Sequence, residues 1–300
     1  MKVSALVCTR NRPAPVAHVV ASLLADKSEP IELLVIDQSD GEETERALDV
    51  FASDPRFRYL RSKVRGKGAA LNEGLKLAKQ AIVVCTDDDC EVPPGWVTDM
   101  ARVLESEPSA VVLFCNVVAV EHDATKGYVP TYTVPRNRLL RSISAICGGL
   151  GIGAGMAVRR DFALSVGGFD ESFGPGARFP SADEWDLAMR ALLSGKHVYE
   201  TTELSLLHDG FRTFEEGRVH ARRDWIALGA VCAKPLRAGY LSAAVVPVWL
   251  FGTRALLPPV MDALHFRRPR GVVRVTAFLR GFVEGFRTPV DAETLCFTRK

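Results

Sequence analysis

Three consecutive carboxylates, Asp87, Asp88 and Asp89, directly follow the mostly apolar run Ala81–Thr86. A short apolar run of this kind is typical of a buried strand in a parallel sheet, so the aspartates lie where that strand leaves the sheet. Crowded carboxylates repel one another and resist desolvation, and a divalent cation that carries a phosphate relieves both problems. Mg²⁺ and Mn²⁺ suit carboxylate oxygens and usually keep ligands from substrate phosphates. A solvated acidic turn explains the same three residues equally well.

The elements that position these carboxylates are strands alternating with helices. The apolar patterns predict strands at residues 2–8, 31–36, 57–60, 81–86 and 110–120, and helices at residues 14–25, 42–51, 69–78 and 96–104. This alternation predicts an α/β protein with a doubly wound, mainly parallel sheet flanked by helices. Right-handed crossovers bring the carboxyl ends of such strands to one edge of the sheet, where ligands bind.

Polar residues end two further strands of this predicted sheet. Thr9 and Arg12 follow the first strand, and Asp37 follows the second. We therefore expect them to share one site with the aspartate triplet. In that site Asp37 can accept a hydrogen bond from a nucleobase or a ribose, while Arg12 and Lys67 can meet phosphate.

Gly66 and Gly68 flank Lys67 in a basic loop. Small residues there let backbone N–H groups approach a diphosphate, although a flexible surface loop has the same composition. The glycine-rich stretch 148–155 lies mid-chain and matches a dinucleotide fingerprint poorly.

Later in the chain, Asp183 and Glu184 open a helix that reaches about residue 194. Acidic residues in a first helical turn are favoured by the helix dipole; the functional alternative is a general base that faces the metal site. Residues 197–199 and 204–207 are expected to form short strands, and His208 follows them. A single histidine is usually structural, but one at a strand end can join a metal or phosphate site.

Composition describes an ordinary globular chain of 300 residues, with 47% hydrophobic and 25% charged residues. The formal net charge of +2 gives no reason to expect a nucleic-acid partner. The seven cysteines are scattered without metal-ligand spacing, which is typical of buried thiols in a reducing cytosol. The N-terminus has no secretory signal layout, so a cytoplasmic location is expected.

Positive charge is concentrated near the C-terminus. Residues 234–287 hold nine Lys or Arg and two acidic residues, a net charge of +7. The apolar run 241–257 contains only Arg254 as a charge, and its uncharged part is shorter than the roughly 20 residues of a spanning helix. We favour a helix lying in the plane of an anionic membrane, at the inner face of the cell membrane. The alternative is a helix that packs on the rest of the chain or, in a homo-oligomer, on a partner subunit.

Taken together, these motifs resemble those of the family-2 glycosyltransferases, which are inverting enzymes of the GT-A fold. Six segments match in the family's order over roughly residues 1–210. They are Cys8–Arg12, Val35–Ser39, Gly66–Leu75, Asp87–Asp89, the pair Gly153–Arg160 and Gly167–Glu171, and Asp183–Leu187. The chain departs from the pattern at Gln38, at Gly155 and at the exchanged acids of Asp183 and Glu184.

The resemblance implies a GT-A catalytic domain at residues 1–210. The remaining residues, 211–300, are expected from their own pattern to form a helical extension. The resemblance also implies a nucleotide-diphosphate sugar donor, a sugar or lipid-linked acceptor, and Mg²⁺ or Mn²⁺. The residues implied to bind the donor are Thr9, Arg12, Asp37, Gly66, Lys67, Asn72, Asp87 and Asp88. Asp87, Asp89 and His208 would hold or adjoin the metal and diphosphate, Glu184 or Asp183 would be the base, and Trp185 would meet the acceptor.

Two other functions remain open from the sequence. A phosphatase of the haloacid-dehalogenase type also places an Asp-x-Asp motif after a strand, but Glu91 stands where it wants Thr or Val. A non-catalytic subunit that binds nucleotide sugars would explain the departures at Gln38, Gly155 and the exchanged acids.

Overall fold

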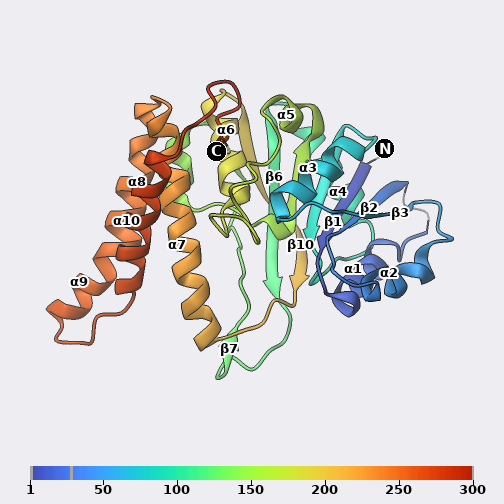
Figure 1. Cartoon of the computed structure of the whole chain (residues 1–300), viewed down its shortest axis with the longest axis horizontal. Helices are drawn as coiled ribbons and strands as arrows, with labels where there is room; N and C mark the ends of the chain where they lie inside the picture. Colours follow the sequence, from blue (N-terminus) through green and yellow to red (C-terminus); the bar gives the residue numbers. More distant parts are fainter. Residues whose placement is uncertain (1–2, 28–29, 299–300) are drawn as a thin grey trace.

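The computed structural model describes residues 3–27 and 30–298, so Lys2, at the start of the first predicted strand, lies outside the described residues. The centre is a sheet with strand order β3-β2-β1-β4-β9-β6-β10-β5, and β8 pairs with β10 off this path (Figure 1). Its strands are β1 (Val3–Thr9), β2 (Ile31–Asp37), β3 (Phe57–Arg61), β4 (Ile82–Asp87), β5 (Cys90–Glu91), β6 (Ala110–Ala119), β8 (Arg138–Leu140), β9 (Met156–Arg159) and β10 (His197–His208). A small separate sheet pairs β7 (Gly127–Tyr128) with β11 (Arg212–Thr213).

The predicted doubly wound, mainly parallel sheet is confirmed. Strands β1 to β4 pair in parallel, and β10 pairs in parallel with β6. Strand β9 runs antiparallel between β4 and β6. Because side chains alternate across a strand, Leu6, Leu34 and Val83 pack into one core, while Val7 and Val84 pack into a second core on the other face.

One strand expectation was wrong. Residues 197–199 and 204–207 do not form two short strands, because β10 runs unbroken from His197 to His208. Its pairing with β6 has an irregularity between Glu200 and Ser205. The polar residues of that interval reduced the apolar signal, yet Glu200 and Thr201 are fully buried in the sheet.

Helices cover both faces of the sheet. The helices of the described chain are α1 (Pro13–Leu23), α2 (Glu43–Leu48), α3 (Lys67–Leu77), α4 (Trp96–Ser106), α5 (Arg160–Ser165), α6 (Asp183–Leu193), α7 (Phe214–Arg237), α8 (Val245–Trp249), α9 (Leu257–Leu264) and α10 (Val272–Arg287). Helices α1 and α4 pack on one core, and α3, α5 and α6 pack on the other. Three-turn or longer amphipathic helices of this kind owe most of their stability to such packing.

The C-terminal helices stand beside α6 at one end of the sheet (Figure 1). Helices α7 and α10 approach closely because glycines line their contact. A Cβ atom on Gly281 would lie 1.9 Å from the Ile226 carbonyl oxygen, and one on Gly229 would lie 2.2 Å from that of Phe278. The backbones of α7 and α10 are therefore in direct contact at these glycines.

The apolar segment near the C-terminus is longer than the sequence indicated. Helical structure runs from Leu241 to Leu264 through a π-helical stretch at Leu250–Leu256, and it is long and apolar enough to cross a membrane by length and composition alone. The expectation that the apolar run is too short is thereby corrected, because the helix continues past Arg254 and past the prolines at 258 and 259. About 28% of its most apolar window is buried against the rest of the chain.

Candidate active site

A cavity of about 560 Å³ lies at the carboxyl ends of β1 and β4. It is lined by residues that are far apart in the sequence. These include Thr9, Arg12, Gln38, Gly66, Lys67, Asp87, Asp88, Asp89, Asp183, Glu184 and His208. The parallel strands and their crossovers thus bring most of the predicted site residues together.

Asp88 anchors the side chains that follow β1. Thr9 Oγ1 donates a hydrogen bond of 2.6 Å to Asp88 Oδ2, and Arg12 pairs with Asp88 Oδ1. Arg12 also bridges to Asp89 Oδ2 at 3.1 Å. Burial raises the pKa of Asp88 to about 6 against the opposing effects of Arg12 and Thr9. Asp88 is therefore turned toward the protein, and Asp87 and Asp89 flank it.

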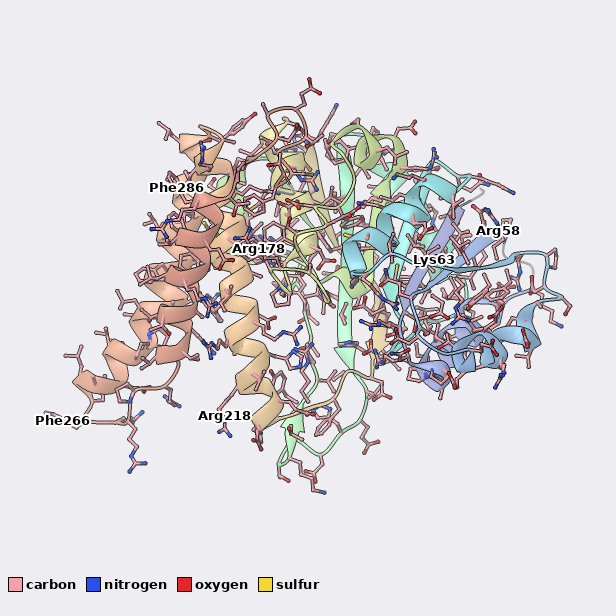
Figure 2. All side chains as sticks on the ribbon, in the orientation of Figure 1. Arg58, Lys63, Arg178, Arg218, Phe266 and Phe286 are labelled. Atoms are coloured by element: carbon pink, nitrogen blue, oxygen red, sulfur yellow. The ribbon has the colours of Figure 1, made fainter. Side chains whose placement is uncertain are left out.

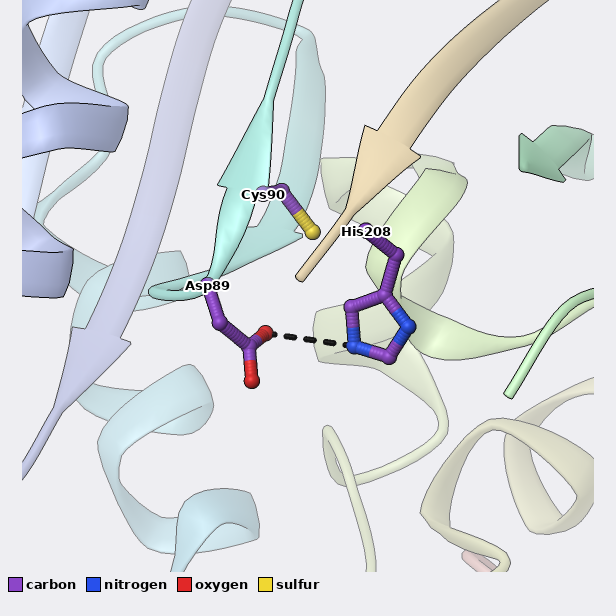
Figure 3. Close-up of side chains that lie close together, drawn as sticks. All are labelled: Asp89, Cys90 and His208. Atoms are coloured by element: carbon purple, nitrogen blue, oxygen red, sulfur yellow. Dashed lines mark ion pairs between the residues drawn. The ribbon is translucent and has the colours of Figure 1, made fainter. Parts of the chain in front are cut away.

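Asp89 faces His208 across the end of β10 (Figure 3). The antiparallel pairing of β5 with β10 places His208 opposite Cys90, and His208 Nε2 lies 3.2 Å from Asp89 Oδ1. The other ring nitrogen, Nδ1, lies 2.9 Å from the Pro130 carbonyl oxygen, which can only accept a hydrogen bond. Nδ1 therefore carries a proton, and Nε2 is directed at the aspartate. Burial opposes a charged imidazole, but Asp89 outweighs it and raises the pKa of His208.

These residues fit a divalent cation. In the described part of the chain, buried Asp89 Oδ1 accepts no hydrogen bond apart from its ion pair with His208, and it shares a cluster with His208 and Cys90 whose ligand atoms lie within 4.8 Å of one another. A carboxylate oxygen opposite an imidazole nitrogen that is oriented by a backbone carbonyl is a donor set suited to a metal. Burial raises the pKa of Cys90, which keeps its sulfur a neutral thiol and a weak ligand.

Asp183 and Glu184 occupy the first turn of α6 and line the same cavity. Ala182, in the left-handed conformation at φ 67°, turns the chain into this helix. Burial raises the pKa of Glu184 well above its usual range, and the neighbouring Asp183 carboxylate raises it further. A carboxyl group with a raised pKa in a cleft is the form that a general base takes.

Lys67 connects the two acidic groups. Its ammonium forms an ion pair with Asp87. Burial opposes its charge, but Asp87 first and then Asp183 raise the pKa of Lys67 well above its usual range. Lys67 therefore supplies a fixed positive charge between the aspartate triplet and the α6 acids.

Three predicted site residues do not line the cavity. Asp37 is fully buried, and its carboxylate accepts hydrogen bonds of 2.8 Å from the Ser39 backbone and the Tyr59 hydroxyl. Asn72 bonds to both backbone groups of Phe169 at 2.7 and 2.9 Å. Trp185 packs, partly buried, against the core. Their contacts position backbone segments around the site.

The structure adds basic residues that sequence reasoning missed. Arg212, His220 and Arg223 line the cavity from β11 and α7. Neither Arg212 nor Arg223 forms an ion pair within residues 3–27 and 30–298. The one available signal was the spacing of three between His220 and Arg223, which places both on one helix face.

Comparison with known proteins agrees with this arrangement. The family model described as Glycosyl transferase family 2 matches residues 4–165. The chain is 26% identical over 215 residues to a glucosyl-dolichyl phosphate glucuronosyltransferase of Haloferax volcanii, a match covering 67% of this chain and 64% of that protein. The chain therefore spans less than two thirds of that relative's length.

Solved structures share the fold at low identity. The S. aureus TarS 1–349 structure superposes with a TM-score of 0.63 at 15% identity, covering 95% of this chain and 82% of that one. The mannosyltransferase PcManGT from Pyrobaculum calidifontis, in complex with GDP-Man and Mn²⁺, gives 0.59 at 17% identity, covering 95% and 87%. At these identities the likeness establishes the fold.

Proposed function

The chain belongs to glycosyl transferase family 2, and from that premise we propose that it transfers a sugar from a nucleotide-diphosphate sugar to an acceptor hydroxyl with inversion. One observation carries the proposal. A single cavity is lined both by the aspartate triplet with His208 and by the Asp183 and Glu184 pair. Separate sites for these groups would place the base away from the anomeric carbon that the acceptor hydroxyl attacks.

The reaction needs a base and a stabilised leaving group. Glu184, with Asp183 as the alternative, takes the proton from the acceptor hydroxyl. The electron pair that this leaves on the acceptor oxygen forms the new bond to the anomeric carbon. The bond from that carbon to the diphosphate oxygen breaks on the opposite face. The electron pair of that broken bond leaves with the diphosphate. No enzyme nucleophile is required.

Basic side chains suited to a diphosphate line the cavity. Arg12 and Lys67 pair with the aspartates, and Arg212 and Arg223 line the cavity from the extension. Asp87, Asp89 and His208 would hold Mg²⁺ or Mn²⁺. When bound, the cation neutralises charge on the departing phosphates. Gly66 and Gln38 border the nucleotide end, where Gln38 Nε2 donates to the Gly66 carbonyl at 3.1 Å.

Three further predicted residues contribute indirectly in this proposal. Asp37 fixes the turn that presents Gln38, and it meets a nucleobase only if the hydroxyl of Tyr59 gives way. Asn72 fastens the backbone at Phe169. Trp185 follows Glu184 in α6 and packs against the core, so it acts on the acceptor side only by holding this helix in place.

The acceptor is proposed to be a sugar or a lipid-linked sugar in cell-surface polysaccharide or glycolipid synthesis. The name of the Haloferax volcanii relative includes a dolichyl phosphate, a lipid carrier. Exposed apolar residues along Leu241–Leu264 and the surplus of arginines support peripheral contact with an anionic membrane, at its cytoplasmic face.

The test is release of nucleoside diphosphate from a panel of nucleotide sugars with Mn²⁺ and candidate acceptors. Glu184→Gln is expected to lower acceptor-dependent release by about 10² to 10⁴-fold, the usual contribution of a general base. Glu215→Gln, an exposed carboxylate in the first turn of α7, is the matched control. Equal rates in the two variants would refute Glu184 as the base, and no release from any donor would refute the transferase.

A further inference from the structure

A second and larger cavity, of about 1010 Å³, is an open groove between α10 and the loop that follows β9 and α5. Its lining shares no residue with that of the active-site cavity. Its lining comprises Glu171, Ser172, Arg178, Leu279, Arg280, Val283, Glu284, Arg287, Thr288, Pro289 and Thr298.

The groove combines apolar side chains with arginines. Leu279 and Val283 remain 47% and 46% exposed on the outer face of α10. Arg280 and Arg287 are seven residues apart, which places them on that same face, and neither has an ion pair in the described part of the chain. The third cation, Arg178 (Figure 2), is neutralised by Glu284 at 2.8 Å. Two guanidinium groups that form no ion pair with a described residue, next to apolar surface, suit an anion that carries a hydrocarbon chain.

One loop forms a wall of both cavities. Ser172 and Arg178 line the groove, whereas Pro175, Gly176 and Ser181 line the active-site cavity. The loop is fastened on the active-site side, because the Lys67 backbone N–H donates to the Pro175 carbonyl at 3.0 Å. A molecule seated in the groove therefore lies next to the segment that leads into Glu184.

We propose that this groove binds the phosphate and the first part of the hydrocarbon chain of a lipid-linked acceptor, whose sugar reaches past the loop to Glu184. The role of the groove in catalysis rests on the proposed sugar transfer. The binding experiment does not, because it measures binding without donor or metal. Arg280 and Arg287 hold the phosphate, and Leu279 and Val283 contact the chain. A free phosphate would leave the apolar half of the groove unused, and a neutral sugar would leave the arginines without a counter-charge.

The experiment measures equilibrium binding of geranylgeranyl monophosphate, below its micelle concentration, to the full chain without donor or metal. The double variant Arg280→Gln/Arg287→Gln is expected to raise Kd at least about tenfold, as loss of charged hydrogen bonds does. Val283→Asp is expected to weaken binding as well. The control Arg218→Gln/Arg222→Gln removes the same charge from exposed positions on α7 and should leave Kd unchanged. Circular dichroism and thermal unfolding of each variant verify the fold.

Each other outcome overturns the proposal. Inorganic phosphate binding as tightly as the prenyl phosphate would show an anion site without a lipid. If geranylgeraniol, which lacks the phosphate, binds as tightly as the prenyl phosphate, Arg280 and Arg287 do not hold a phosphate. Arginine variants that lose only binding to phosphatidylglycerol vesicles would show a membrane surface instead. Because donor hydrolysis is assayed separately, a chain that hydrolyses nucleotide sugars but ignores the prenyl phosphate refutes the groove alone.

Discussion

Lys234 Nζ lies 2.8 Å from Asp170 Oδ2, and the same ammonium pairs with Asp186. Lys234 belongs to α7 in the extension, whereas Asp170 and Asp186 belong to two of the segments that resemble family motifs. All three side chains are at least 97% buried. Arg190 neutralises the other oxygen of Asp186 at 2.8 Å. The extension thus supplies the counter-charge that holds α6 at Asp186, two residues beyond Glu184.

Replacing Lys234 by Met is expected to lower the free energy of unfolding by about 3–5 kcal/mol, because it leaves buried aspartates without their partner. Lys76→Met, at an exposed position on α3, is the control and should change stability by less than about 0.5 kcal/mol. Urea unfolding measures both. Losses of similar size would show that the Lys234 pairs contribute little. Two separate transitions in the native chain would show that residues 211–300 unfold independently.

The sequence predicted the regular part of the fold because apolar runs and helical spacing report burial directly. The strands β1, β2 and β4 and the polar clusters at their ends follow from that pattern. The path of β10 did not, because buried Glu200 looks like a loop residue until Tyr132 and Gly151 are seen to donate to it at 2.8 and 3.0 Å.

The sequence predicted those site residues that directly follow a strand. Asp37 ends a strand as expected, but its burial depends on Tyr59 from the next strand, a contact that no local pattern encodes. Arg223 lies on a helix with ordinary polar composition, and only the packing of α7 beside the sheet places it in the cavity. Lys234 is likewise visible only when α7 and α6 are seen together.

The acid limb of the pH–rate profile is expected to lie above the range of an ordinary carboxyl group. Burial and Asp183 raise the pKa of Glu184, so the base is protonated, and activity lost, at higher pH than for an exposed glutamate. Asp183→Asn removes a neighbouring negative charge and should move this limb to lower pH while activity persists. Acceptor-dependent rates across the pH range measure it. Abolished activity in Asp183→Asn would assign Asp183 as the base instead.

Arg223→Ala is expected to raise KM for the donor about tenfold, because a guanidinium contact to a phosphate is lost. Arg222→Ala is the matched control, since Arg222 is the adjacent residue but is exposed and does not line the cavity. Initial rates against donor concentration compare the two. An unchanged KM in Arg223→Ala, or an equal rise in both variants, would exclude α7 from donor binding.

The tip between α9 and α10 is expected to carry the membrane contact. Phe266 is fully exposed at φ 54°, next to Arg267 and Arg268, and it lies at an extremity of the molecule (Figure 2). The variant Phe266→Ser/Arg267→Gln/Arg268→Gln should weaken binding to phosphatidylglycerol vesicles more than about tenfold.

Vesicle co-sedimentation tests this tip directly. Arg46→Gln/Arg102→Gln removes two exposed arginines elsewhere and is expected to sediment like the native chain. Point variants are preferable to deleting residues 238–287, because that deletion would remove α10 and uncover the glycine-lined face of α7. Equal sedimentation of the tip variant and the native chain would exclude the tip.

The most direct measurement of the shared cation and diphosphate site is the thermal midpoint of the chain with nucleotide sugars, Mn²⁺, or both. A ligand that binds only the folded state raises Tm. We predict that at least one nucleotide sugar raises Tm strongly only when Mn²⁺ is present, and that Asp89→Asn removes this dependence. A native chain whose Tm responds to no nucleotide sugar, with or without Mn²⁺, would contradict the account.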